Sequence, residues 1–501
     1  MGSKYAVSAG KRKVPFAADI GNGAVLCEAC RMPRHATPLP ELELDIEKIV
    51  HGGQGLARIA LPRRPGDPAA PSDRFVVFVD DALPGERVAA SVYQRKRSHA
   101  FARATRVLRA SPDRVAPDCP RFGRCGGCSF RHCRYAAQPA YKKDVLLEAL
   151  HGVCDPALVR DVVPSPVSDD YRGKMVFAFG ETLEGELKVG MHRRGSYIHV
   201  LDADCCRLQS AASRELVRRV RDMAVAHGWH AFHEIRKTPG LRTLAIRESR
   251  ATGERMAELS ATEFPPGLAE AFLEAAGDLA TSVILSLDRH LHGPPHADER
   301  TFLKGDGWME ERLNGFRFRI GPDTFFQNNP AQAAALFARL REMARAGGRR
   351  KTALDLFSGT GPIAFHLADV AETVVAAETW APSVAVAKEN ARLNGIGNVR
   401  FLEADVNAAS AGALFPEKVD LVAVDPPRPG LSEDAVRAIR ALSPEEIYYV
   451  SCNPATLARD LKLLCDCGAY AVTDVEPYDF FPHTFHLETL VRLERRKGAE
   501  G

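Results

Sequence analysis

The clearest hydrophobic pattern lies in the last third of the chain, where short apolar runs alternate with helical stretches. Helical segments such as Pro382–Asn394 separate the apolar runs. Strands are predicted at 353–357, 373–378, 399–403, 421–424, 447–451, 469–475 and 489–494. Alternation of strands and helices predicts a doubly wound, mostly parallel sheet. Residues 326–501 are therefore predicted to form a Rossmann-like α/β domain.

Two other patterns precede this domain. Over residues 41–112, short β-type runs separated by Gly and Pro predict a small closed β-barrel of the OB type, a scaffold used for oligonucleotides. The runs lie at 42–50, 55–59, 75–79 and 87–92, and an alternating stretch to Leu108 follows them. Over residues 113–325, helical pieces mix with strands, which predicts an α+β domain. The strand candidates there include 173–179, 187–192, 243–248, 282–287 and 316–320. Residues 1–40 show no sustained periodicity and are interpreted as an extension. Cys27 and Cys30 form a C-x-x-C there, without a second pair nearby to complete a zinc site.

Composition narrows the class of protein further. The 501 residues are 45% hydrophobic and 26% charged, as in ordinary globular proteins. The chain holds no apolar run near the ~20 residues that span a bilayer, and no apolar segment follows the basic N-terminus. We expect a cytoplasmic monomer with no membrane partner. Twelve cysteines in such a compartment indicate buried, metal-bound or catalytic thiols rather than a disulfide framework.

Positive charge is concentrated in one segment. Between residues 90 and 134 the chain has eleven Arg and Lys residues and two acids, a net +9, so the rest of the chain carries −6 of the total +3. A stripe of one sign along possible β structure indicates a polyanionic partner such as RNA. The alternative interpretation is a surface whose charges only keep the chain soluble.

A glycine-rich turn follows the first predicted strand of the C-terminal domain. Residues 355–361 read D-L-F-S-G-T-G, and Gly359 and Gly361 let the backbone turn sharply towards a ligand at the carboxyl edge of the sheet. Glu378 closes the next strand, where an acid suits the two hydroxyls of a ribose. The same turn fits the G-x-G-x-x-A dinucleotide fingerprint, so a nicotinamide enzyme is an alternative at this point.

Two further acids favour a methyltransferase. Asp405 follows the third strand and is placed to receive an adenine amino group. Asp425 begins the run D-P-P-R-P-G, which puts a carboxylate and a stiff proline turn at the mouth of the crevice. Such turns are typical of methyltransferases that act on bases, whereas dehydrogenase chemistry does not require them. S-adenosyl-L-methionine is therefore the predicted cofactor.

Methylation of uracil at C5 requires a cysteine and a carboxylate beside the methyl donor, because thiolate addition to C6 activates C5 and a base must then remove the C5 proton. The run Y-Y-V-S-C-N-P at the end of the fifth strand offers Cys452, and F-P-H-T-F-H-L-E before the last strand offers Glu488. A lone cysteine is often a buried small hydrophobe, but the strand-end position of Cys452 favours a nucleophile. His483, His486 and Glu488 could also be metal ligands, although no fourth ligand motif is evident.

These four runs, in this order, resemble the motifs of the RNA 5-methyluridine methyltransferase family over residues 41–495. The segment G-P-D-T-F-F-Q-N-N just upstream resembles the family's F-F-Q-x-N, and the barrel resembles a TRAM domain. The resemblance implies Cys452 as the nucleophile and Glu488 as the base. It implies cofactor contacts from Gln327, Phe357, Glu378, Asp405 and Asp425. Pro362 departs from the family, which commonly has an asparagine there.

A cysteine cluster distinguishes the segment after the barrel. Cys119, Cys125 and Cys128 have the C-x5-C-x2-C spacing of an iron–sulfur or zinc site. The candidates for a fourth ligand are Cys133, Cys205 and Cys206. Ribosomal RNA members of the family carry this run with a distant fourth cysteine, which implies a [4Fe-4S] cluster and aligns best with Cys206.

Three alternatives remain beside a 23S ribosomal RNA methyltransferase. A transfer RNA uracil-5-methyltransferase shares the catalytic motifs, but many bacterial transfer RNA relatives lack both the barrel and the cysteine cluster. A catalytically idle RNA-binding protein would not need the Cys452–Glu488 pair. A nicotinamide oxidoreductase is the most distant reading.

Overall fold

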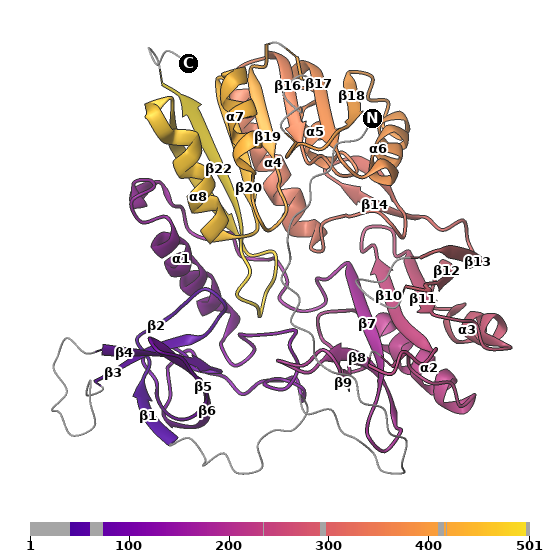
Figure 1. Cartoon of the computed structure of the whole chain (residues 1–501). Coiled ribbons are helices and arrows are strands. Elements are labelled where there is room, and N and C mark those ends of the chain that lie inside the picture. Colours follow the sequence, from indigo (N-terminus) through magenta and orange to yellow (C-terminus); the bar gives the residue numbers. More distant parts are fainter. Residues whose placement is uncertain are drawn as a thin grey trace, which may run out of the picture.

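The structure is a computed structural model that describes residues 41–60, 74–233, 235–290, 297–408, 415–416 and 418–496. The Cys27–Cys30 pair lies outside the described residues. The chain forms a multidomain α/β protein with three large sheets, which follow one another along the sequence (Figure 1). None of the helices in the described part of the chain is both long and apolar enough to cross a bilayer.

The N-terminal sheet has the strand order β1-β5-β6-β4-β3-β2. Its strands are β1 Glu41–Asp45, β2 Lys48–Ile49, β3 Gly55–Ala60, β4 Arg74–Asp80, β5 Arg87–Arg95 and β6 His99–Arg109. The run expected as one strand at 42–50 is divided, because the chain changes partner there. Ile46 N donates to Glu86 O, whereas Glu47 N donates to Leu56 O. Small and branched side chains of the strands fill the interior of this sheet.

The central sheet has the order β13-β12-β11-β10-β7-β8-β9 and is antiparallel except between β11 and β12. Its strands are β7 Lys174–Glu181, β8 Leu187–His192, β9 Val200–Asp202, β10 Leu241–Glu248, β11 Arg255–Ala261, β12 Ser282–Leu287 and β13 Glu299–Lys304. Two helices, α2 Ala211–Ala226 and α3 Leu268–Ala276, contribute apolar side chains to its core. The mixture of helices and strands expected for this region is confirmed.

The C-terminal sheet has the order β18-β17-β16-β19-β20-β22-β21. Its strands are β16 Arg350–Leu356, β17 Ala371–Glu378, β18 Val399–Glu403, β19 Leu421–Val424, β20 Glu446–Ser451, β21 Tyr470–Tyr478 and β22 Glu488–Arg495. The helices are α4 Pro330–Ala346, α5 Pro362–Leu367, α6 Ala381–Leu393, α7 Glu433–Leu442 and α8 Pro454–Cys465, with a short 3-10 turn at Asp466–Gly468. All pairs up to β20 are parallel, and β22 is antiparallel to both neighbours. The predicted doubly wound sheet is confirmed.

Two earlier segments pack on the C-terminal sheet. Helix α1, Gln138–Ala149, lies between the short 3-10 turns Tyr135–Ala137 and Pro156–Leu158 and packs against α8 (Figure 1). Its Leu146 joins the apolar core under that sheet. The hairpin of β14 Met309–Leu313 and β15 Phe316–Ile320 joins the core on the other side. Segments expected to belong to the α+β region therefore complete the C-terminal domain.

Candidate active site and cysteine cavity

A cavity of about 710 Å³ opens at the carboxyl ends of the parallel C-terminal strands, where open α/β sheets bind their ligands. Most of the predicted catalytic and cofactor-binding residues line it, namely Gln327, Phe357, Glu378, Asp425, Cys452 and Glu488. Asp405 is exposed instead, and its carboxylate accepts a hydrogen bond from Asn407 N at 3.0 Å. Asn407, rather than Asp405, lines the cavity.

Strand pairing brings Cys452 and Glu488 to the same end of the sheet. Cys452 directly follows β20 and Glu488 begins β22, and Ser451 lies opposite Thr489 in the antiparallel register of these strands. Glu488 is only 6% exposed and Cys452 is half-buried. Burial raises the pKa of the Cys452 thiol to about 12, helped by the nearby Glu488 and Asp425. The thiol is therefore mainly protonated at neutral pH in the free protein. Burial also raises the pKa of Glu488 well above its usual range, and the nearby Asp425 adds to this shift.

The glycine turn after β16 is held by the acid at the end of β17. Gly359 N donates to one carboxylate oxygen of Glu378 at 2.9 Å, and Trp380 N donates to the other at 2.8 Å. Phe357, at the start of the turn, has a left-handed φ of 64°, so its backbone bends sharply towards the cavity. The hydroxyls of Ser358 and Thr360 are buried without a hydrogen-bond partner among the described residues. Unpaired hydroxyls at the wall of a cavity fit a polar ligand that would satisfy them.

The electrostatics of this cavity fit a cationic ligand. Glu378, Asp425 and Glu488 line it, and Asp355 is fully buried at the end of β16. Burial raises the pKa of Asp355 well above its usual range, and the neighbouring Asp425 and Glu378 add to the shift. Burial also raises the pKa of Asp425 to about 7. A positively charged group in the cavity would lower these pKa values and would be stabilised in return.

One cavity residue was not singled out in the sequence, and another was considered there only as a metal ligand, although both lie inside its motifs. Arg428 stands in the D-P-P-R-P-G run, and its positive charge lowers the pKa of both Cys452 and Glu488 against the effect of burial. His486 stands two residues before Glu488, and its Nε2 lies 3.4 Å from Arg428 Nη2. Their place beside the thiol could have been inferred only from the strand pairing.

The segment from Asp479 to Leu487, which leads into Glu488, is held by residues from α1 and the cysteine-bearing region. Lys142 of α1 forms a fully buried ion pair with Asp479, with 2.6 Å between Nζ and Oδ1. The same ammonium donates to Phe481 O at 3.1 Å and to His486 O at 2.9 Å. One charged side chain therefore joins both ends of this segment, which projects below the sheet in Figure 1.

His483 forms the second attachment of this segment. Its N–H donates to Gln138 Oε1 at 2.8 Å, and its carbonyl oxygen accepts from both Ser129 N and Phe130 N at 2.9 Å. The imidazole Nδ1 lies 3.1 Å from Gln138 Nε2. Within the described residues, His483, His486 and Glu488 do not form a metal-binding group. In the run F-P-H-T-F-H-L-E, His483 therefore attaches the segment to the rest of the protein, whereas His486 and Glu488 line the cavity.

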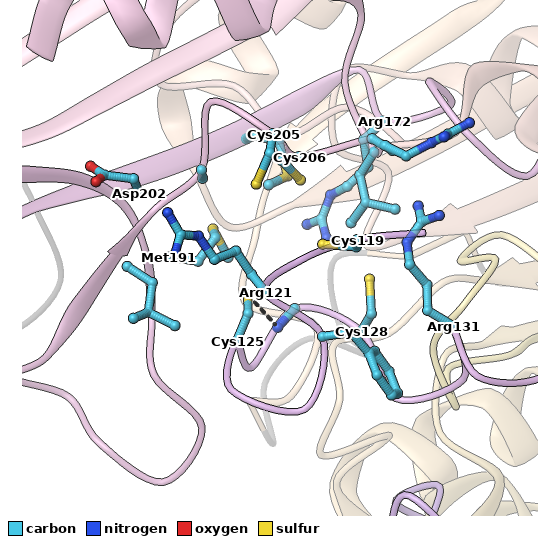
Figure 2. A pocket seen from close by; sticks show the side chains of 17 residues that line it. Cys119, Arg121, Cys125, Cys128, Arg131, Arg172, Met191, Asp202, Cys205 and Cys206 are labelled. Carbon is cyan, nitrogen blue, oxygen red and sulfur yellow. Dashed lines mark hydrogen bonds between the residues drawn. The ribbon is translucent and has the colours of Figure 1, made fainter. Parts of the chain in front are cut away.

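A second cavity, of about 40 Å³, is lined by cysteines from two distant parts of the chain. They are Cys119, Cys125, Cys128, Cys205 and Cys206. Figure 2 shows the sulfur atoms of Cys119, Cys128, Cys205 and Cys206 turned towards a shared space. Burial raises the pKa of Cys128 to about 12 and that of Cys206 to about 11, and neighbouring thiols add to both shifts. Buried thiols that raise one another's pKa fit a metal centre, because a bound metal makes thiolate the stable form.

The candidates for a fourth ligand differ in their positions. The thiol of Cys206 is near enough to interact electrostatically with Cys119, Cys125 and Cys128. The pKa of Cys205, in contrast, is affected by only one of these three thiols, that of Cys119. Cys133 does not line the cavity. It packs in a separate apolar cluster, and its Sγ donates to Arg134 O at 3.5 Å.

Comparisons with known proteins agree with this geometry. The model of the tRNA (uracil-5-)-methyltransferase family matches residues 306–496. The chain is 34% identical to an uncharacterized RNA methyltransferase of Gloeobacter violaceus, covering 90% of this chain and 95% of the relative. It is 33% identical to one of Halalkalibacterium halodurans, covering 90% and 96%. The solved tRNA (uracil-54, C5)-methyltransferase of Pyrococcus abyssi, in complex with S-adenosyl-L-homocysteine, is similar with a TM-score of 0.70 and 26% identity, covering 90% of this chain and 99% of that one.

Together with the cavity, these similarities define the class: the protein is an S-adenosylmethionine-dependent RNA methyltransferase. Within that class the chain belongs to the RNA uracil-5-methyltransferase family, so the resemblance noted in the sequence is confirmed. The nicotinamide reading of the glycine turn is set aside.

Proposed function

We propose that the protein methylates C5 of a uridine in 23S ribosomal RNA, with Cys452 as the nucleophile and Glu488 as the base. The observation that carries the proposal is that Cys452, just after the end of β20, and Glu488, at the start of the antiparallel β22, line the wall of one cavity, which Asp425 also lines. S-adenosyl-L-methionine supplies the methyl group from its sulfonium. Gln327, Phe357, Glu378 and Asp425 would hold it, while Asn407 lies on the wall where Asp405 was expected.

In the proposed reaction, the Cys452 thiol gives its proton to solvent water, and the thiolate sulfur adds to C6 of uracil. The electrons of the C5–C6 double bond then form a bond from C5 to the methyl group, and the donor leaves as S-adenosylhomocysteine. Glu488 removes the C5 proton, the double bond forms again, and the thiolate is expelled. The raised pKa of Glu488 suits this role, because a carboxylate with a high pKa is a stronger base. Arg428 favours the thiolate form of Cys452.

The cysteine cavity and the N-terminal barrel support ribosomal RNA as the substrate. Cys119, Cys125, Cys128 and Cys206 would hold a [4Fe-4S] cluster, whose contribution would be to cross-link the loop before α1 to the turn after β9. The six-stranded sheet with its inward-facing apolar side chains would be a TRAM-like OB barrel. A transfer RNA substrate is the second candidate, because the Pyrococcus abyssi enzyme that matches over 90% of this chain acts on tRNA.

The nucleophile is tested by trapping. RNA with 5-fluorouridine at the target should form a stable covalent adduct with the wild-type protein, because fluorine does not leave as a cation. Cys452→Ala should form none, while Cys465→Ala, at a half-buried cysteine outside the cavity, should form the adduct normally. An adduct that survives in Cys452→Ala would overturn the assignment. Mapping 5-methyluridine in ribosomal and transfer RNA of a deletion strain separates the two substrates.

A further inference from the structure

The turn between β2 and β3 of the N-terminal barrel packs against the segment that leads into Glu488. Gly53 in this turn has a left-handed φ of 80°, and a Cβ added there would lie only 3.2 Å from Phe485 Cβ, so the position suits glycine. The imidazole of His51 meets the Phe485 ring edge-on, with centroids 5.5 Å apart. The barrel therefore touches the catalytic domain through the two residues His51 and Gly53.

Phe485 is also held by a group of apolar side chains outside the C-terminal sheet. It packs against a buried cluster that includes Ile49 of β2, Leu83 of the β4–β5 turn and Phe130 of the loop before α1. Two of these three side chains belong to the barrel. The position of the Phe485 ring therefore depends on the barrel more than on the sheet that carries Cys452.

The ring contacts continue from Phe485 to an arginine of the cavity. The rings of Phe485 and His486 lie with centroids 4.1 Å apart, and Phe481 meets the His486 ring edge-on at 5.8 Å. Arg428 Nη2 lies 3.4 Å from His486 Nε2, and because a guanidinium can only donate, this nitrogen accepts. Burial lowers the pKa of His486 to about 4, and the positive charges of Arg428 and Lys142 add to the shift, which keeps the accepting imidazole neutral.

The guanidinium of Arg428 depends on this contact. Among the residues that the structure describes, it has no ion-pair partner and a single hydrogen-bond partner, His486. The charged groups near the Cys452 thiol are Glu488 of β22 and, from the segment after β19, Asp425 and Arg428. Of these groups, Arg428 is the one whose charge favours the thiolate. The place of its guanidinium therefore sets how much of the thiol is ionised.

We propose that His51, a residue of the N-terminal barrel, is a positioning residue of the active site. Its contact with Phe485 keeps the ring of His486 in place, and His486 in turn keeps the guanidinium of Arg428 beside the Cys452 thiol. The proposal deepens the proposed function and rests on it for the role of this thiolate as the nucleophile. A barrel that is displaced from the catalytic domain would leave the thiol less reactive even without RNA.

Alkylation of Cys452 by iodoacetamide tests this role in the full-length protein, purified without oxygen, in the absence of RNA and methyl donor. Tryptic peptide 441–459 contains Cys452 as its single cysteine, so mass spectrometry of that peptide gives the rate. At pH 8, below the thiol pKa of about 12, the rate is proportional to the fraction of thiolate. The imidazoles of His51 and His486 have lowered pKa values and stay neutral at this pH.

The expected effects follow from the charge and from the ring contact. Arg428→Gln should slow alkylation about tenfold, because the loss of one nearby positive charge raises the pKa of a thiol by about one. His51→Ala should slow it about threefold, since an edge-on ring pair biases an equilibrium by a factor of about 2 to 12. His51→Phe keeps an aromatic ring against Phe485 and should restore the wild-type rate.

The double variant separates positioning from a general loosening of the cavity. If His51 acts through the guanidinium, His51→Ala should have no further effect in an Arg428→Gln background. The matched control is His99→Ala, which removes another edge-on imidazole contact of the barrel, 5.2 Å between the centroids of His99 and Phe101, and should keep the wild-type rate.

Two results would overturn the proposal. They are an unchanged rate in His51→Ala, and the same factor lost with and without Arg428, which would mean only easier or harder access to the thiol. The alkylation assay involves no RNA and no methyl transfer. A 5-fluorouridine adduct that survives in Cys452→Ala would therefore overturn the proposed function and leave the effect of His51 on this thiol unaffected.

Discussion

Binding of the methyl donor should release a proton from Asp425. Burial raises the pKa of this carboxyl to about 7, although Gln327 Nε2 donates to its Oδ2 at 3.3 Å and opposes the shift. At pH 7 about half of the molecules therefore carry a protonated Asp425. S-adenosylmethionine has a positive sulfonium, and a positive charge near a carboxyl favours its ionised form.

The size of the effect follows from that pKa. A sulfonium that lowers the pKa of Asp425 by about two units ionises nearly every molecule, so binding at pH 7 should release about 0.5 proton per site. The release should fall towards zero at pH 9, where the carboxyl is already ionised before the donor binds. S-adenosylhomocysteine has the same shape around a neutral sulfur and should release no proton from this group.

Isothermal titration calorimetry measures this release. The observed binding enthalpy at pH 7 is compared in phosphate, imidazole and Tris buffers, and its slope against the ionisation enthalpy of the buffer gives the number of protons exchanged. Asp425→Asn keeps an oxygen for Gln327 and removes the titrating group, so its slope should be smaller than that of the wild type. Any slope left in that variant reports on Asp355 and Glu488, whose pKa values are also raised by burial and by Asp425. Equal slopes for S-adenosylmethionine and S-adenosylhomocysteine in the wild-type protein would refute the reasoning.

Three further predictions concern other parts of the site. Glu488→Gln should accumulate a methylated covalent protein–RNA intermediate on natural RNA, visible by mass spectrometry, and normal turnover would place the base elsewhere. Anaerobically purified protein should contain about four irons per chain, which Cys206→Ser should lose and Cys133→Ser should keep; stoichiometric zinc would mean another metal. Lys142→Met should destabilise the segment before Glu488 by about 3–5 kcal/mol, because it leaves the Asp479 carboxylate buried and unpaired, and hydrogen exchange unchanged in that segment would contradict this.

Short apolar runs predicted several strands together with their ends. The strands β8, β12, β15, β18 and β19 begin and end where the apolar runs do. Strand β11 was not predicted, because Arg255 and Glu258 interrupt its apolar pattern. The structure gives both side chains partners, since Arg255 pairs with Glu248 and Glu258 pairs with Arg300. A charge with a buried partner elsewhere in the chain is compatible with an inner strand, and the partner is not visible in a local pattern.

The sequence predicted those residues of the candidate site that lie at the ends of predicted strands. Cys452 and Glu488 could be named from their motifs, and both line the cavity. Asp405 was expected on the wall for the same reason, but the chain after β18 turns so that Asn407 takes that position. The charge of the basic stripe could be summed from the sequence, whereas pairs such as Arg106–Glu41, 65 residues apart, appear only in the folded chain.

The attachment of the segment before Glu488 to α1 also implies an order in which the parts of the protein fold. Gln138 and His483 are 345 residues apart, so their contact closes one of the longest loops in the chain. The C-terminal sheet can bury most of its own apolar side chains before this contact forms, but the segment that leads into Glu488 is attached to α1 only afterwards. A refolding protein should therefore recover its sheet signal by circular dichroism before it regains the ability to methylate RNA. An isolated fragment of residues 306–496 should leave the segment from Asp479 to Leu487 without its attachment to α1.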